Sequence, residues 1–240
     1  DEHLMKRWIW ELIQNAKDCS KEERSYIKKS DKITYTRTSQ TVDIKIIFDK
    51  SKKILIFKHN GFPFTSRTLN SLMYRDSTKE NDEDKTGRFG TGFMTSHTLS
   101  RTVPIHAPFL SHHDDVWELS YIEAIVYREG KSDKQLKKEF VKMEESKKQF
   151  PYDKNNEEHE WTTFTYELKS EENLKSAELG IQSFRENIME VLLFCNEIHS
   201  IQLNDEDPIF SSAVSSSKNL TQSLKGQNIF SSINLMEKNV

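Results

Sequence analysis

The chain is poor in cysteine: Cys19 and Cys195 are the two cysteines among its 240 residues. Two cysteines cannot form the disulfide framework of a small secreted domain, so we expect a reducing, intracellular compartment. Long apolar runs are also missing: the longest, such as residues 191–195, fall far short of the about 20 residues that a membrane-spanning helix needs. No signal-peptide pattern opens the sequence. These absences predict a cytoplasmic protein that does not bind a membrane. A nuclear location is also compatible with them.

Excess charge of either sign is small. The 35 Lys and Arg residues nearly balance 38 Asp and Glu residues, which leaves a net charge of -3. No field from the whole chain therefore draws it to nucleic acid or to an acidic membrane. With 35% hydrophobic residues, a chain of this length can bury a substantial core in one or two domains.

The most informative pattern lies on a helix predicted over residues 8–19. A helix turns by about 100° per residue, so Glu11, Asn15 and Asp18 fall on one narrow stripe. Such a stripe, taken alone, is more often a solvated helix face than a site. The motifs that follow it favour a functional role. The opposite arc of the helix is apolar and is expected to face the core, with Met5, Ile9, Leu12, Ile13 and Ala16.

Two further motifs follow in order. Strands predicted over residues 42–48 and 53–57 run into the turn His59-Asn60-Gly61. A charged stretch then opens into residues 86–93, Thr-Gly-Arg-Phe-Gly-Thr-Gly-Phe, ahead of a helix predicted over residues 94–100. Glycines in such a loop expose backbone N–H groups that can hold phosphate oxygens. A loop of this kind is equally often a simple turn, and it fits neither the P-loop nor the Rossmann fingerprint.

Together and in this order, the motifs resemble those of the GHKL ATPases. This Bergerat-fold superfamily includes gyrase B subunits, heat-shock protein 90 chaperones, MutL, MORC proteins, sacsin and histidine kinases. The stripe on residues 11–18 resembles its N-box, and residues 87–93 resemble its glycine-box. Residues 77–79, Ser-Thr-Lys, are similar to its Ser-Gly-Thr-Lys motif, and a strand predicted over residues 160–168 resembles its closing strand. The resemblance spans residues 3–168 and is closest to the heat-shock, MORC and sacsin forms.

The resemblance implies a fold and a ligand. We expect an α/β two-layer sandwich, in which a mixed, mostly antiparallel sheet is backed by helices and a mobile lid over residues 75–91 closes on ATP and Mg²⁺. Glu11 would be the general base that orients the attacking water, Asn15 would hold Mg²⁺, Asp18 would support the pocket floor, and Thr162 would help to bind adenine through water. The other expected nucleotide contacts are His59, Asn60, Gly61, Lys79, Gly87, Arg88, Phe89, Gly90, Thr91, Gly92 and Phe93.

Two departures from the family pattern concern the motif that reads the nucleotide base. The adenine-reading aspartate is replaced by His59, and the second glycine of that motif by Pro63. A neutral imidazole can still accept a hydrogen bond, so we expect the adenine contact to weaken when acid protonates the ring. The alternative is a histidine that merely packs at the end of a strand, with Asn60 forming the turn.

The remaining sequence predicts the organisation around this unit. Residues 1–168 would form the nucleotide-binding domain, and residues 169–240 a connecting helix (Glu171–Phe194), a strand (Ile198–Leu203) and the start of a transducer-like second domain with a polar, irregular tail. We also expect a strand over 122–128 and a charged helix over 131–148. Residues 112–115, His-His-Asp-Asp, are expected on a loop and to bind no metal, because neighbouring side chains there diverge.

The function implied is a slow, Mg-dependent ATPase that acts as a conformational switch within a larger protein. It would be chaperone-like or similar to MORC and MutL. The protein could also form a homodimer when ATP binds, and the sequence does not identify its client protein. One alternative is a nucleotide-gated binding or dimerisation module without significant hydrolysis. A histidine kinase domain is less favoured, because such kinases usually lack the N-box glutamate that Glu11 matches.

Overall fold

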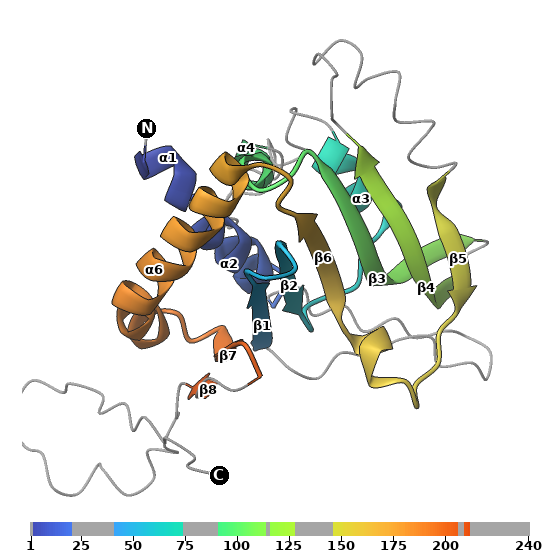
Figure 1. Cartoon of the computed structure of the whole chain (residues 1–240). Helices are drawn as coiled ribbons and strands as arrows, with labels where there is room; N and C mark the ends of the chain where they lie inside the picture. The colour runs from blue at the N-terminus through green and yellow to red at the C-terminus, as the bar shows by residue number, and fades with distance from the viewer. Residues whose placement is uncertain are drawn as a thin grey trace, which may run out of the picture.

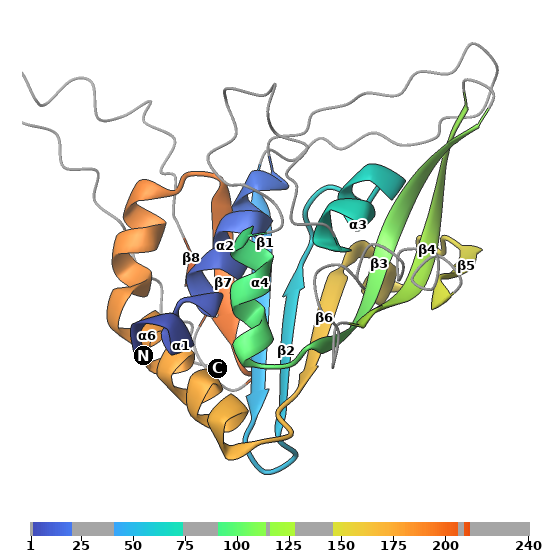
Figure 2. The same ribbon diagram turned by 90° about the horizontal axis from the view of Figure 1, so that it is seen from above.

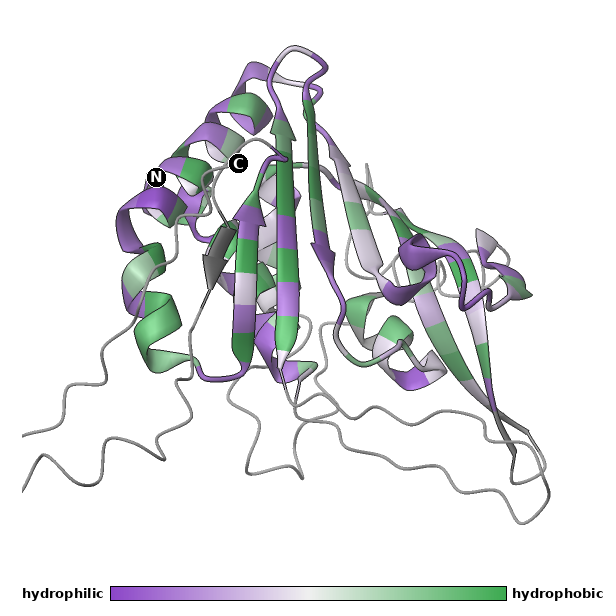
Figure 3. Ribbon diagram, turned by 90° about the horizontal axis from the view of Figure 1, so that it is seen from below, coloured by the Kyte–Doolittle hydropathy of each residue, from purple (hydrophilic) through white to green (hydrophobic). Residues whose placement is uncertain are grey.

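The computed structural model describes residues 2–20, 41–73, 91–113, 116–127, 146–205 and 209–211. Within these ranges, eight strands form one sheet in the order β5-β4-β3-β6-β2-β1-β7-β8. Neighbouring strands are antiparallel except β1 and β7, which are parallel. Helices α2 and α6 cover one face of the sheet (Figures 1 and 2), and the opposite face is turned to the viewer in Figure 3. The predicted α/β class, a mixed sheet backed by helices, is confirmed.

The described elements follow the chain in a simple order. The helices are α1 (Glu2–Lys6), α2 (Trp8–Asp18), α3 (Ser66–Met73), α4 (Thr91–Thr95), the 3-10 helices η1 (Ser96–Thr98) and η2 (Glu157–Glu160), and α6 (Glu171–Phe194). The strands are β1 (Val42–Asp49), β2 (Ile54–His59), β3 (Thr102–His113), β4 (Val116–Tyr127), β5 (Lys148–Pro151), β6 (Thr162–Glu167), β7 (Ile198–Leu203) and β8 (Ile209–Ser211). No helix in this described part is both long and apolar enough to cross a membrane.

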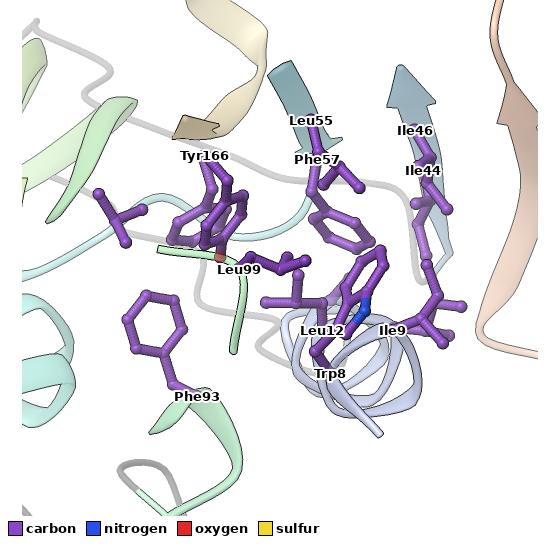
Figure 4. Packing of buried hydrophobic residues seen from close by; sticks show 14 of the residues in the cluster. Trp8, Ile9, Leu12, Ile44, Ile46, Leu55, Phe57, Phe93, Leu99 and Tyr166 are labelled. Carbon is purple, nitrogen blue, oxygen red and sulfur yellow. The ribbon is translucent and has the colours of Figure 1, made fainter. Parts of the chain in front are cut away.

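The core lies between α2 and the sheet. Side chains alternate along a strand, so every second residue of β1, β2 and β6 points to the helices. Ile44, Phe57 and Tyr166 are buried in this way and pack with Trp8 and Leu12 of α2 (Figure 4). Burying a large apolar side chain stabilises the fold by about 1.5–3 kcal/mol, so this layer fixes the position of α2 on the sheet.

Helix α6 begins and ends as predicted. Ser170 and Asn173 form a capping box at its start, in which each side chain binds the other residue's backbone N–H. The helix packs on α2, and Phe184 and Ile188 belong to the same core. Strand β7 then joins the sheet beside β1. Residues 171–203 thus share the core and sheet of the preceding residues, and a second domain stays a prediction.

Three local predictions were wrong. The helix expected over 94–100 is divided into α4 and η1, and Leu99 and Ser100 lie outside both. The charged helix expected over 131–148 has the wrong end: Ser146 is helical, but Lys148 lies in β5, while residues 131–145 are outside the described part. His112 and His113 were expected on a loop but lie in β3.

Strand β3 was not predicted because it contains Pro104 and Pro108. Proline has no backbone N–H and is rare in central strands. Here β3 pairs with β6 only through Ile105 and His106. Beyond them, the carbonyl of Pro108 accepts a hydrogen bond from the N–H of Phe64 at 3.0 Å. Both prolines therefore lie outside the short stretch in which β3 pairs with β6.

Candidate functional site

A pocket lies where the C-terminal half of α2 meets the end of β2. Its walls come from five segments of the chain, between residues 12 and 164, and its free volume is about 20 Å³. That volume is enough for about one water molecule. The lining residues are Leu12, Asn15, Cys19, His59, Phe64, Leu72, Phe93 and Phe164.

The polar stripe of α2 is not a solvated face. Asn15 lines the pocket and is half-buried, as is Glu11. Asp18 is buried at the end of the helix. It is not one of the residues that line the pocket, so the floor position expected for it stays a prediction. The amide and carboxylate oxygens of Asn15 and Glu11 are of the kind that Mg²⁺ prefers. No group of three or more His, Cys, Asp or Glu residues suited to a metal occurs within the described ranges.

The Glu11 carboxylate is held between two groups. Arg7, one turn earlier, donates to Glu11 Oε1 from Nε at 2.9 Å and from Nη2 at 2.8 Å. The other oxygen, Oε2, lies so close to Gly92 that a Cβ at that position would collide with it. Only glycine therefore allows the start of α4 to approach the carboxylate this closely. The contact with Arg7 was not predicted, although its i,i+4 spacing on a helix is a signal for an ion pair.

His59 is buried at the end of β2, with 4% of its surface exposed. Its Nδ1 accepts a hydrogen bond from the backbone N–H of Gly61 at 3.2 Å. A Cβ at Gly61 would lie 2.6 Å from Cys19 Cβ and 2.9 Å from His59 Nδ1, so the turn requires glycine for space. The structure therefore joins the His-Asn-Gly turn to the end of α2 by direct contact.

Asn60 uses its side chain within the sheet. Its Nδ2 donates to Asp43 Oδ2 at 2.9 Å, and its Oδ1 accepts from the backbone N–H of Asp43 at 2.7 Å. Asp43 Oδ1 also bonds His199 Nδ1 at 2.8 Å and accepts from the Ser200 hydroxyl. Burial raises the pKa of Asp43, but the hydrogen bonds from Ser200, His199 and Asn60 outweigh it and leave that pKa below its usual range. Asn60 thus ties the turn to β1 and, through Asp43, to β7.

Thr162 lies directly opposite His59 in the β2–β6 register. Residues in direct register share a face of the sheet, so Thr162 is on the face that carries His59 and Phe164 toward the pocket. Its hydroxyl is buried and has no hydrogen-bond partner within the described residues. A buried hydroxyl in this situation is suited to a bound water or ligand.

Several predicted contacts cannot be placed. Lys79, Gly87, Arg88, Phe89 and Gly90 lie outside the described residues, as does most of the predicted lid. Thr91 begins α4, but its side chain is also outside the description, whereas Phe93 lines the pocket. The structure thus brings together the N-box-like helix, the His-Asn-Gly turn, the last residues of the glycine-rich segment and the strand of Thr162.

Comparison with known proteins adds no family to this picture. No protein-family model matches the chain. No curated protein matches it at a significant level.

Proposed function

We propose that the chain is a Mg-dependent domain that binds and slowly hydrolyses a nucleoside triphosphate, built on a Bergerat-type fold and acting as a conformational switch. ATP is the nucleotide that the resemblance implies. The observation that carries the proposal is the contact of Glu11 with Gly92, beside a pocket lined by Asn15 and His59. Segments that the sequence separates by up to about 150 residues converge there, which supports one site built from all of them.

Glu11 has the geometry of a general base with one oriented oxygen. Arg7 occupies Oε1, so Oε2 is the oxygen that points toward the glycine-rich segment. A carboxylate oxygen in this place can accept a proton from a water that attacks a terminal phosphate. When bound, Mg²⁺ neutralises phosphate charge, and the Asn15 amide oxygen is the group that would hold it.

The small pocket supports a switch. A free volume of about 20 Å³ is smaller than a nucleotide base, so a base bound within this pocket would displace lining side chains. Leu72 of α3 and Phe93 of α4 line the pocket and stand on either side of the predicted lid in the sequence. Nucleotide binding would then be coupled to a displacement of α3 and α4, which is the property of a ligand-gated switch.

Single-turnover hydrolysis tests the proposal. Mg²⁺ complexes of ATP, GTP and ITP are mixed with wild type, Glu11→Ala and the matched control Glu190→Ala, which removes an exposed glutamate from α6. Binding is first measured by calorimetry, so that each protein is saturated. We expect wild type and Glu190→Ala to release phosphate, and Glu11→Ala to bind but turn over about 10²–10⁴-fold more slowly. Asn15→Ala should lose Mg-dependent binding. Absence of binding by wild type would overturn the proposal.

One observation favours the alternative of a nucleotide-gated binding module without significant hydrolysis. Arg7 lies 2.8 Å from Glu11 Oε1 in an ion pair, so one of the two carboxylate oxygens is already engaged by a cation and is not open to a water. Replacing Arg7 with Met keeps much of the side-chain bulk and removes the charge. If wild type binds tightly without turnover and Arg7→Met turns over, the ion pair keeps the site inactive and the gated module is favoured. A slower Arg7→Met would instead assign Arg7 to positioning the base.

A further inference from the structure

Strand β7 carries a bulge beside Asp43. In the parallel register of β1 with β7, Val42 pairs with Ile198 and Asp43 pairs with Ser200, so His199 is an extra residue between the two pairs. A bulge of this kind changes the direction of the side chains near it. Here His199 Nδ1 lies 2.8 Å from Asp43 Oδ1, and the Ser200 hydroxyl donates to the same oxygen. Two neighbouring residues of β7 therefore hold one carboxylate oxygen.

The other oxygen of this carboxylate holds the turn after β2. Asp43 Oδ2 accepts from Asn60 Nδ2 at 2.9 Å, and Asn60 Oδ1 accepts from the Asp43 backbone N–H at 2.7 Å. The backbone N–H of Asn60 also donates to the Asp43 carbonyl at 3.2 Å. Because three hydrogen bonds join these two residues, the position of the turn depends on the position of the Asp43 carboxylate.

The next residues of the turn contact the wall of the pocket. The backbone N–H of Phe62 donates to the carbonyl of Cys19 at 3.0 Å, and that of Gly61 donates to His59 Nδ1 at 3.2 Å. Gly61 lies so close to Cys19 and His59 that a Cβ at this position would collide with both. Cys19 and His59 line the pocket. A shift of the turn would therefore displace two of the residues that shape the pocket.

We infer that Ser200 and His199 are positioning residues for this pocket, which they influence through Asp43 and Asn60. Neither residue of β7 lines the pocket. Hydrogen bonds to an ionised carboxylate are among the stronger ones in proteins, so two donors on Oδ1 fix the orientation of the whole group. The carboxylate in turn fixes the turn between β2 and the end of α2. The inference rests on the proposed function, because its affinity test uses a nucleotide as the ligand of the pocket.

The test removes the Ser200 hydroxyl and then restores it. Ser200→Ala deletes one donor to Asp43 Oδ1, whereas Ser200→Thr keeps a hydroxyl on a residue that suits a strand. The matched control is Gln202→Ala, which shortens a half-buried side chain on the same strand, opposite Lys45 and not Asp43. Calorimetry measures binding of the β,γ-imido analogue of ATP, with Mg²⁺, to the full chain. We expect Ser200→Ala to weaken binding by about 2–30-fold, and the other two variants to bind as wild type does.

Amide hydrogen exchange, followed by NMR, gives a readout without a nucleotide. The Phe62 amide, bonded to the Cys19 carbonyl, reports on the turn. The amides between β2 and β6 report on the sheet as a whole. Exchange follows local opening, so we expect Ser200→Ala to speed exchange at Phe62 and to leave the β2–β6 amides unchanged. Equal acceleration at both places would show a general loss of stability and would overturn the positioning role.

The outcomes separate this inference from the proposed function. If wild type binds no nucleotide, the proposed function is overturned, and faster exchange at Phe62 in Ser200→Ala still supports the positioning role. Unchanged exchange at Phe62 overturns the inference whether or not a nucleotide binds. Faster exchange with unchanged nucleotide affinity also overturns it. The double variant His199→Ala/Ser200→Ala removes both donors and should bind more weakly than Ser200→Ala; equal binding would overturn the role of His199.

Discussion

Gly92 packs directly against the carboxylate of Glu11, so that even a single methyl group at position 92 would collide with Oε2. The contact joins the first turn of α4 to the first turn of α2. Since the atom in the way is the end of a flexible side chain, the fold can yield there at small cost. When the fold yields in this way, however, the Glu11 carboxylate is displaced from its present position.

Under the proposed function, Gly92→Ala is therefore expected to lower turnover much more than stability. The added methyl displaces Oε2, and loss of an aligned base costs about 10²–10⁴-fold in rate. The free energy of unfolding, from urea titration followed by circular dichroism, should change by less than about 1 kcal/mol. An active Gly92→Ala enzyme would contradict the assignment of Glu11 as the base.

Gly61→Ala should instead lower the stability of the fold. Its new Cβ would lie 2.6 Å from Cys19 Cβ, an atom fixed to the backbone at the end of α2. Overpacking of this kind destabilises by about 1–3 kcal/mol. Because Cys19→Gly removes the opposing Cβ, the double variant should regain part of the loss in a double-mutant cycle. Additive losses in the cycle would show that the contact with Cys19 is not the cause.

Gly180→Ala should destabilise the protein although alanine is the better helix former. Helix propensity alone would favour the change by about 1 kcal/mol. The new methyl would, however, enter the ring of Trp8, whose Nε1 donates to the carbonyl of Ser176 at 2.9 Å. The ring is fully buried and cannot move aside. Urea unfolding measures the sign, and a more stable Gly180→Ala would contradict the close packing of α6 on α2.

Asp43 should make the free energy of unfolding depend on pH in the acidic range. Its pKa is lowered in the folded state, so it stabilises the fold above its unfolded pKa of about 4 and loses this effect as pH falls through the folded value. We expect wild type to be more stable than Asp43→Asn at pH 7, and the difference to shrink below about pH 4. Urea unfolding of both proteins between pH 3 and pH 7 measures it. A difference that is constant with pH would contradict the role of the Asp43 charge.

Amphipathic patterns predicted much of the fold. The apolar spacing located α6 to the residue, and the strands beside the His-Asn-Gly turn fell within two residues of their predicted ends. Strand β3 was missed because Pro104 and Pro108 argue against a central strand. Their tolerance depends on how few bonds β3 makes with β6, which is a property of the assembled sheet.

The candidate site was only partly visible in the sequence. The spacing on α2 predicted which side chains face one direction, but the hydrogen-bonding sense of His59 depends on a backbone N–H two residues later. No residue pattern fixes which ring nitrogen that N–H will meet. The closeness of Gly92 to Glu11 likewise arises from the packing of α4 on α2, across about 80 residues of sequence.

The parallel pairing of β1 with β7 decides where this chain can be shortened. A chain that stopped after β6 would lack the strand that pairs with one side of β1, and it would uncover Trp8, which α6 now covers. The open backbone edge beside Ile44 and Ile46 would then be free to pair with other molecules. Aggregation is the expected fate of such a fragment, because the last strands of the described chain complete the sheet that its first strand begins.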